Sequence, residues 1–192
     1  SDVYKRQSYE LRIPKDRIAV LIGKNGKVKK ELESATKTKI EVDSQEGDVF
    51  ITGKDPIKLF NVREIIKAIG RGFNPEVAML LLKVDYSLEI IDVRQFAKTK
   101  NDTIRLKGRV IGAGGKSRRT IEQLTETNIC VYGKTIGIIG EIENVSVSRR
   151  AIESLLSGSP HGNVYKWLEK QRRDRKTRYL IGEEERKWQE TG

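Results

Sequence analysis

Two short segments of the chain combine paired glycines with lysine, and each could hold a phosphate group. The first reads Leu-Ile-Gly-Lys-Asn-Gly-Lys over residues 21–27, and the second reads Val-Ile-Gly-Ala-Gly-Gly-Lys over residues 110–116. Glycine has no Cβ, so it adopts unusual dihedrals and lets a ligand approach the backbone closely. A helix that begins at such a loop offers unpaired N–H groups and the positive end of its dipole to an anion. The two segments therefore predict two phosphate-binding loops.

The two loops belong to an internal repeat. With an offset of 89 residues, Gly23 aligns with Gly112, and Gly26 aligns with Gly115. Two matched glycines could arise by chance, but a register that continues well beyond the loops predicts a tandem repeat of one nucleic-acid-binding module. The further matched pairs are Leu32 and Ile121, Thr38 and Thr127, Ile40 and Ile129, and Val42 and Val131.

The composition favours a polyanionic partner. The 192 residues carry 38 Lys and Arg against 27 Asp and Glu, a formal net charge of +11. Basic side chains release condensed counterions when they meet phosphates, so nucleic acid is the simplest partner. The single Cys130 excludes an intrachain disulfide framework and suits a reducing cytoplasm, and with one histidine no zinc site is expected. No apolar run approaches the roughly 18 residues of a membrane span, and no signal peptide is recognisable, so we expect a cytoplasmic protein.

Hydrophobic periodicity predicts the same order of elements in both halves: strand, helix, helix, strand, strand, helix. In the first half we expect strands at 9–13, 38–42 and 49–52 and helices at 15–22, 27–36 and 55–69, with Ile57, Phe60, Ile65 and Ile69 on the core side of the last helix. In the second half we expect strands at 87–93, 128–132 and 135–139 and helices at 101–110, 116–125 and 143–156. An apolar connector helix at 76–82 should pack between the halves. A basic helix at 163–178 follows, with fraying at 182–185, and residues 1–7 are left out of the prediction.

This order, with an Ile-Gly-x-x-Gly loop between the first two helices, resembles the type I KH domain. In that family the loop clamps about four nucleotides of single-stranded nucleic acid. The resemblance implies an α+β fold of two tandem type I KH domains (βααββα), each with a three-stranded antiparallel sheet and helices packed on one face, plus a C-terminal basic helix. We expect the KH domains at 8–73 and 85–158, the connector helix at 74–84, and the C-terminal basic helix and tail at 159–192.

The KH resemblance assigns RNA-binding residues to both loops. In the first repeat they are Gly23, Lys24, Asn25, Gly26, Lys27 and Lys30. In the second repeat they are Arg109, Ile111, Gly112, Ala113, Gly114, Gly115, Lys116, Arg118 and Arg119. The bases would lie in apolar grooves, although several of the groove residues must also serve the core. The grooves are assigned to Leu21, Ile22, Ile40 and Val42 and to Val110, Ile111, Ile129 and Val131.

Other interpretations of single motifs are weaker. The segment 112–117 ends in Gly-Lys-Ser. A Walker loop needs a glycine and then four residues before that triplet, whereas only two residues separate Gly112 from it. A Walker loop also follows a strand, whereas a helix is expected here. His161 lies in a Ser-Pro-His-Gly loop without a nearby nucleophile or carboxylate, so no catalytic role is expected. Cys130 is expected to be a small packed side chain, and Trp167 is expected to anchor the last helix. That helix carries seven Lys or Arg against two acids and could be either a solvated surface or an RNA contact.

A longer stretch, residues 9–175, resembles one tandem-KH family, the archaeal and eukaryotic small-subunit assembly factors called Dim-two or partner of the Nob endonuclease. The resemblance is carried by Arg-Val-Ile-Gly-Ala-Gly-Gly-Lys-Ser-Arg-Arg-Thr-Ile-Glu-Gln-Leu-Thr-Glu-Thr-Asn-Ile over 109–129, and by Gly-Ser-Pro at 158–160 followed by Val164 and Tyr165. Eukaryotic members have lost the first glycine loop, whereas it is intact here, which favours an archaeal-type protein. The second loop has Ala113 and Gly114 where a basic residue is common, so its charge must come from the residues that follow. The related Krr-type assembly factor is similar enough to be confused with this family.

The resemblance implies a non-catalytic protein that binds single-stranded RNA at the 3′ region of the small-subunit (16S) rRNA during ribosome biogenesis and assists pre-rRNA processing. No cofactor, metal or membrane is expected. The Nob endonuclease and the alpha subunit of translation initiation factor two are the expected protein partners. Two alternatives stay open: a KH subunit of an exosome-like RNA-degrading complex, which would usually carry an S1 domain whose pattern is missing here, and a translation-linked RNA-binding factor. A nuclease would need clustered Asp and Glu for metal ions, whereas the acids here are scattered among lysines.

Overall fold

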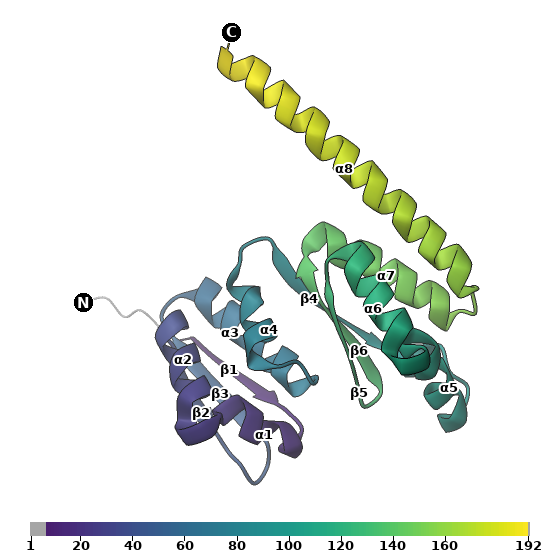
Figure 1. Ribbon diagram of the computed structural model, residues 1–192. Helices are drawn as coiled ribbons and strands as arrows, with labels where there is room; N and C mark the ends of the chain where they lie inside the picture. Colours follow the sequence, from purple (N-terminus) through teal and green to yellow (C-terminus); the bar gives the residue numbers. More distant parts are fainter. Residues whose placement is uncertain (1–6, 192) are drawn as a thin grey trace. The chain divides into compact units, whose positions relative to one another are not determined.

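The computed structural model describes residues 7–191, and its elements follow the predicted order in both halves (Figure 1). The first half contains β1 (Gln7–Arg12), α1 (Lys15–Ile22), α2 (Lys27–Thr36), β2 (Lys39–Val42), β3 (Asp48–Gly53) and α3 (Pro56–Gly70). The second half contains β4 (Tyr86–Asp92), α5 (Lys100–Ile111), α6 (Lys116–Thr125), β5 (Asn128–Tyr132), β6 (Thr135–Glu141) and α7 (Ile142–Leu156). Helix α4 (Pro75–Ala78) and the 3₁₀ turn η2 (Met79–Leu82) connect the halves, and α8 (His161–Thr191) follows the second half.

The residues group into two compact units. One comprises the chain up to Asp92 together with Asn128–Ile142, and the other comprises Val93–Thr127 together with the chain from Glu143 onward. Residues 1–6, which were left out of the prediction, and residue 192 of the predicted tail lie outside the described residues. No helix that the structure describes is both long enough and apolar enough to cross a membrane.

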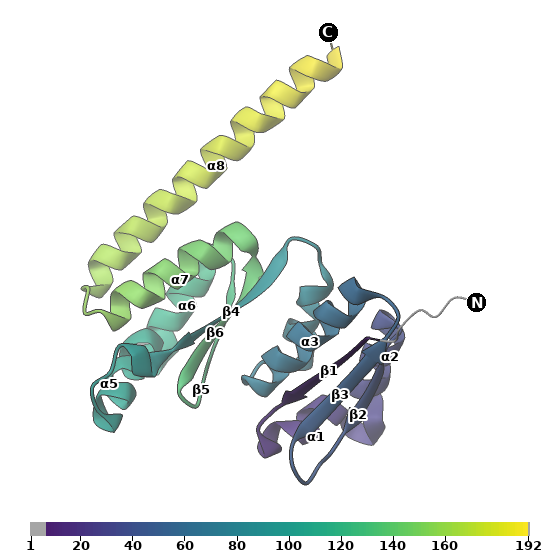
Figure 2. The ribbon, with the colours of Figure 1, turned by 180° about the vertical axis from the view of Figure 1, so that it is seen from behind.

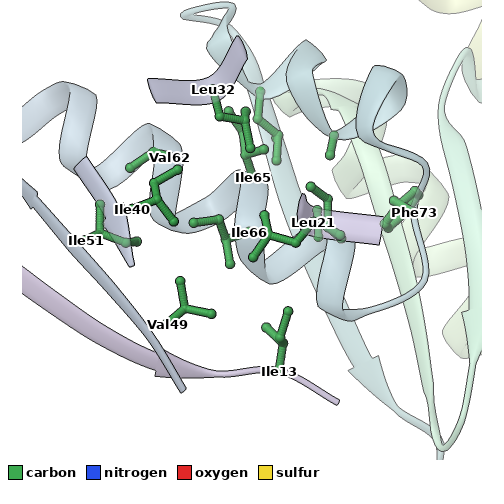
Figure 3. Packing of buried hydrophobic residues seen from close by; sticks show 14 of the residues in the cluster. Ile13, Leu21, Leu32, Ile40, Val49, Ile51, Val62, Ile65, Ile66 and Phe73 are labelled. Atoms are coloured by element: carbon green, nitrogen blue, oxygen red, sulfur yellow. The ribbon is translucent and has the colours of Figure 1, made fainter. Parts of the chain in front are cut away.

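The first sheet has the strand order β1-β3-β2, and its neighbouring strands are antiparallel. Successive side chains of a strand point to opposite faces, so a sheet covered on one side buries every second residue. Val49 and Ile51 of β3 are buried, whereas Phe50 between them is 40% exposed. Ile40 of β2 lies opposite Ile51 and is buried as well. Figure 3 shows the core on this face, which includes Leu21 of α1, Leu32 of α2, and Val62, Ile65 and Ile66 of α3.

Helix α3 turns a different stripe inward than the sequence predicts. Ile65 and Ile69 are buried as predicted. Ile57 and Phe60 are not: their side chains are 72% and 52% exposed, so their assignment to the core was wrong. A helix buries residues three and four apart on one face, and here that face is taken by other apolar residues that fit the spacing. They are Leu59, Val62 and Ile66.

The connector between the halves is partly a 3₁₀ turn rather than one α-helix. Ala78 and Leu81 of this connector are buried in the same hydrophobic cluster as Ile139 of β6. The Phe73 ring lies against Gly137 of β6, where a Cβ would come within 2.5 Å of it. The connector therefore packs between α3 and the strands β4 and β6, as predicted. That the two KH repeats form a fixed pair stays a prediction.

The second repeat has the same topology and the same buried polar pair as the first. Its sheet has the order β4-β6-β5 with antiparallel neighbours. After α6, the Thr125 hydroxyl donates to the Ile121 carbonyl at 2.7 Å and lies 2.8 Å from the Thr127 hydroxyl. Thr36 and Thr38 make the same contacts after α2, at 2.6 and 2.7 Å. The α+β fold of two KH repeats is thus confirmed down to buried side chains.

Helix α8 is longer than predicted. It spans His161–Thr191 without a break, so the expected fraying at 182–185 was wrong. A single glycine in a helix costs only about 1 kcal/mol relative to alanine, and the residues after Gly182 are mostly good helix formers. The Arg186 side chain also donates to the Gly182 carbonyl at 3.1 Å. Both ribbon views show the first turns of α8 beside α6 and α7 and its later turns extending beyond them (Figures 1 and 2).

Candidate nucleic-acid interface

The first glycine loop joins α1 to α2 in a conformation that requires Gly23. Its φ and ψ are 74° and 172°, a region that is open essentially to glycine alone. A Cβ at this position would lie 2.5 Å from Val28 Cγ2 and 2.8 Å from the Val28 backbone nitrogen. Asn25 and Gly26 follow with left-handed φ values of 55° and 72°. The loop presents Lys24 and Asn25 to solvent directly before the first turn of α2.

The second loop reproduces this backbone residue by residue. Gly112 has φ 73° and ψ 173°, and a Cβ on it would lie 2.7 Å from both the Cβ and the backbone nitrogen of Ser117. Gly114 and Gly115 have φ values of 57° and 77°, which match those of Asn25 and Gly26. The repeat predicted from the sequence is therefore confirmed in the dihedral angles of both loops.

Neither helix that leaves a loop uses a side chain to cap its first turn. The N-cap residues are Gly26 for α2 and Gly115 for α6, and neither helix has an acidic residue in its first turn. Helices normally satisfy their first N–H groups with a capping side chain and favour acidic residues near the N-terminus. Here the first turns keep N–H groups and the positive dipole end for an external anion.

Each loop is followed by the same arrangement of charges. Lys29 lies 3.8 Å from Glu33, and its counterpart Arg118 lies 3.4 Å from Glu122, so these two cations each share their charge with a carboxylate. Arg119 folds over the second loop, since a Cβ on Gly115 would come within 2.8 Å of its Nη1. Five other cations are exposed, and within residues 7–191 no ion pair joins them to a carboxylate: Lys24, Lys27, Lys30, Lys116 and Arg119. These five are the predicted RNA-binding cations with the freest charge.

Arg109 has a different position from the one its RNA-binding assignment suggests. Its Nη2 donates to the Ser159 carbonyl at 2.6 Å, and its Nε is buried and has no hydrogen-bond partner among the described residues. Its own carbonyl lies 2.8 Å from Nε2 of His161. Arg109 and His161 therefore join the residues before the second loop to the first turn of α8. Sequence reasoning missed this pair because the two residues are far apart in the chain and no spacing rule connects them.

Helix α1, which leads into the first loop, is held by contacts at its first turns. Arg17 donates to the carbonyls of Ile69 and Phe73, each at 2.8 Å. The Tyr132 hydroxyl donates to the Asp16 carboxylate, and this hydrogen bond raises the pKa of Tyr132 above its usual value. These contacts hold the first turns of α1 against the end of α3 and against β5.

The predicted grooves contain fewer exposed residues than assigned. Leu21, Ile40, Val110 and Ile129 are buried and belong to the core, so their groove assignment was wrong. Residues on adjacent positions of a helix or strand face different directions, so only part of each apolar run can line a groove. The partly exposed members are equivalent in the two repeats. They are Ile22 and Val42 in the first repeat and Ile111 and Val131 in the second.

Other chemistry finds no support among the described residues. No group of three or more His, Cys, Asp or Glu side chains there could hold a metal ion. The segment 112–117 follows helix α5 and not a strand, so it does not form a Walker loop. Cys130 is half-buried and its sulfur lies against Gly72. The Arg150 guanidinium lies 5.0 Å from the centre of the Trp167 ring, which supports the prediction that Trp167 anchors α8.

Comparisons with known proteins agree with this geometry. Residues 87–173 match the family described as eukaryotic type KH-domain (KH-domain type I), and residues 8–68 match the KH domain family. The KH domain-containing protein MJ0443 of Methanocaldococcus jannaschii is 51% identical over 166 residues, which cover 84% of this chain and 73% of that one. A chain in the crystal structure of an a/eIF2alpha–aDim2p–rRNA complex from Pyrococcus horikoshii matches with a TM-score of 0.84 and 45% identity, over 90% of this chain and 97% of that chain. The chain belongs to the Dim2/PNO1 family of tandem KH proteins.

The Dim2/PNO1 family extends to eukaryotes. The pre-rRNA-processing protein pno1 of Schizosaccharomyces pombe is 32% identical over 114 residues, which cover 58% of this chain and 47% of that protein. The match to this relative therefore spans about half of its length. Within the family, the present Dim2/PNO1 chain keeps a complete glycine loop in both repeats.

Proposed function

We propose that this protein binds single-stranded RNA at the 3′ region of the small-subunit rRNA during ribosome biogenesis, and that it assists pre-rRNA processing without catalysing it. The observation that carries the proposal is the doubled glycine loop. Each loop leads into a helix whose first turn is uncapped and lacks acids, and each is flanked by exposed Lys or Arg.

The loops favour a nucleic-acid strand over a small phosphate ligand. A half-exposed aliphatic residue precedes each loop, Ile22 in the first repeat and Ile111 in the second. Bases that follow a clamped backbone can lie on such side chains, whereas an isolated phosphate gains nothing from them. A single strand fits better than a duplex, because only a single strand exposes its bases to an apolar groove.

The relatives support the choice of RNA and of partners. The Pyrococcus horikoshii complex contains aDim2p, rRNA and a/eIF2alpha, and the fission yeast relative is a pre-rRNA-processing protein. On this basis we infer that the present protein binds rRNA and the alpha subunit of translation initiation factor two. The family resemblance adds the Nob endonuclease as a further partner. Since that partner would cleave the RNA, we assign this protein a non-catalytic role. We also propose that it acts in the cytoplasm.

The proposed RNA contacts divide between two domains, at 8–73 and 85–158, with the C-terminal helix as an addition to the second. Both loops have the geometry for binding. We propose that the second contributes more of the affinity, because Arg118 and Arg119 follow it where Lys29 and Lys30 follow the first loop. Arg119 also has a planar, multi-donor head that suits phosphate better than a lysine does.

Fluorescence anisotropy with a labelled RNA tests the proposal. The probe is a short single strand that matches the 3′ end of the small-subunit rRNA, and the controls are a shuffled strand of the same composition and a duplex. Each titration is run at two salt concentrations, because affinity for nucleic acid depends steeply on salt. Tight binding that prefers the matched strand supports the proposal. Equal, weak binding to all three that disappears with salt would contradict it.

A further inference from the structure

Helix α8 carries a concentration of positive charge outside the two glycine loops. Residues 163–178 contain seven Lys or Arg and two acids, whereas residues 179–191 contain two Lys or Arg and four acids. The net positive charge of α8 is therefore confined to its first half. This first half is also the part that packs against the second repeat.

One face of α8 is used for packing. Val164 and Leu168 are buried. About two turns after Leu168, Arg175 donates to the Leu124 carbonyl of α6 at 3.0 Å and to the buried side chain of Asn144 in α7. These contacts fix how the basic half of α8 is rotated about its axis. They also remove Arg175 from the set of cations that a ligand could reach.

The opposite face is a row of free cations. The spacing of four, three and three residues from Lys166 places Lys166, Lys170, Arg173 and Lys176 on neighbouring turns of one side. All four are exposed. Two acids have the spacing to pair with these cations, since Glu169 lies four residues before Arg173 and Asp174 lies four residues after Lys170. In the part of the chain that the structure describes, neither pair forms an ion pair. The pairs Arg118–Glu122 and Arg149–Glu153, which have the same spacing, do form at 3.4 and 2.9 Å.

Helix α8, which carries this row, begins next to the residues that lead into the second glycine loop. His161, the first residue of α8, lies 2.8 Å from the carbonyl of Arg109, three residues before Gly112. Arg175 contacts the carbonyl of Leu124 near the end of α6. Helix α8 therefore runs alongside α6 in the same direction. With a rise of about 1.5 Å per residue, the row from Lys166 to Lys176 extends over roughly 15 Å.

We infer that this basic face of α8, formed by Lys166, Lys170, Arg173 and Lys176, is a second phosphate-binding surface. It holds the RNA backbone outside the nucleotides that the second glycine loop clamps. The inference rests on the proposed function, since it assigns a longer footprint to the same RNA. Contacts to phosphates position a nucleic acid without reading its bases, so this surface adds affinity and salt dependence but not sequence preference.

The test compares two charge-matched variants of the full chain. Lys170→Gln with Arg173→Gln removes two cations from the basic face, and Lys54→Gln with Lys58→Gln removes two cations from the region around the start of α3. Each variant is titrated with an RNA of about twelve nucleotides and with overlapping five-nucleotide segments of it, because the clamp itself holds about four nucleotides. The dependence of log affinity on log salt concentration is measured for each combination.

For single strands each phosphate contact contributes a slope of about −0.7, so the α8 variant should reduce the slope by about 1.4 for the longer RNA. The five-nucleotide segments and the α3 variant should show no such change. An unchanged slope for the longer RNA would overturn the inference and leave the proposed function intact, and so would an equal loss in the α3 variant or with the short segments. Failure of the unmodified chain to bind either RNA would overturn the proposed function instead.

Discussion

Two of the three glycines in the second loop, Gly112 and Gly114, have different conformational requirements. Gly112 occupies a region of φ and ψ that is open essentially to glycine, and a Cβ there would meet Ser117 at 2.7 Å. Gly114 has a left-handed conformation with open space around it, and the equivalent residue of the first loop is Asn25.

Gly112→Ala should therefore lower the free energy of unfolding by about 1–3 kcal/mol, the usual cost of such backbone strain. Gly114→Asn should change it by no more than about 0.5 kcal/mol, because asparagine tolerates the left-handed region. Urea denaturation of both variants gives the comparison. Equal losses at the two positions would contradict the assigned loop geometry.

The cations after the loop also differ. Arg118 lies 3.4 Å from Glu122, whereas Arg119 folds over Gly115 and is exposed. Arg119→Gln should weaken RNA binding and reduce the salt slope by about 0.7, the value expected for one phosphate contact with a single strand. Arg118→Gln should have a smaller effect on both, since part of that charge is neutralised by the carboxylate. Anisotropy titrations at several salt concentrations separate the two, and a larger effect at Arg118 would reverse this ranking.

For single residues, the sequence predicted those features in which the backbone conformation requires a particular residue type, such as glycine. Paired glycines and a lysine identified both loops, and the structure has the same dihedrals at both. The hydrogen-bond partners of side chains could not be predicted from the sequence. The bonds of Arg109 to Ser159 and of His161 to Arg109 depend on how α5 and α8 pack, and residue types alone contain no signal for that.

Among the helices and strands, α8 offers a sharp contrast between anchored and exposed leucines. Leu168 is buried, whereas Leu180 is exposed on the later turns. Leu168→Ala should lower the free energy of unfolding by about 2–5 kcal/mol, the range for large-to-small changes in a core. Leu180→Ala should change it by no more than about 0.5 kcal/mol.

Chemical denaturation measures both leucine variants, and amide exchange along α8 reports whether the first turns have loosened. If the two substitutions had equal effects, the first turns of α8 would not pack as described. We expect the first turns of α8 to lose amide protection in Leu168→Ala and to keep it in Leu180→Ala.

The periodicity of apolar residues predicted every strand and helix of the two repeats but not every buried face. In α3 several apolar stripes compete, and Leu59, Val62 and Ile66 are buried where Ile57 and Phe60 were expected. Only the position of the sheet decides between such stripes. The length of α8 was underestimated for a different reason, because Gly182 is a weak breaker within a run of good helix formers.

For the whole molecule, the fold class could be predicted from the repeat, and the family from its resemblance over residues 109–129 and 158–165. A register of 89 residues, a doubled loop and a net charge of +11 lead to tandem KH repeats that bind RNA. The division of the grooves between core and surface could not be predicted. It depends on which apolar residues the neighbouring elements cover, and four of the eight assigned residues are buried.

We expect both glycine loops to hold RNA phosphates and the second loop to contribute more of the affinity. The most direct test adds one negative charge at the same place in each loop. Asn25→Asp does this in the first loop. Gly114→Asp does it in the second, with Gly114→Asn as the neutral reference, so that both comparisons change an amide to a carboxylate at the same left-handed position.

The measurement is anisotropy with the rRNA 3′-end strand at one fixed salt concentration. A unit charge about 4 Å from a phosphate costs about 1 kcal/mol in water, so each added carboxylate should weaken binding about five-fold. Both added carboxylates should weaken binding, and the loss should be larger for Gly114→Asp relative to Gly114→Asn than for Asn25→Asp relative to the unmodified chain. Unchanged affinity in both comparisons would contradict the claim that the loops bind RNA, and a larger loss for Asn25→Asp would contradict the leading role of the second loop.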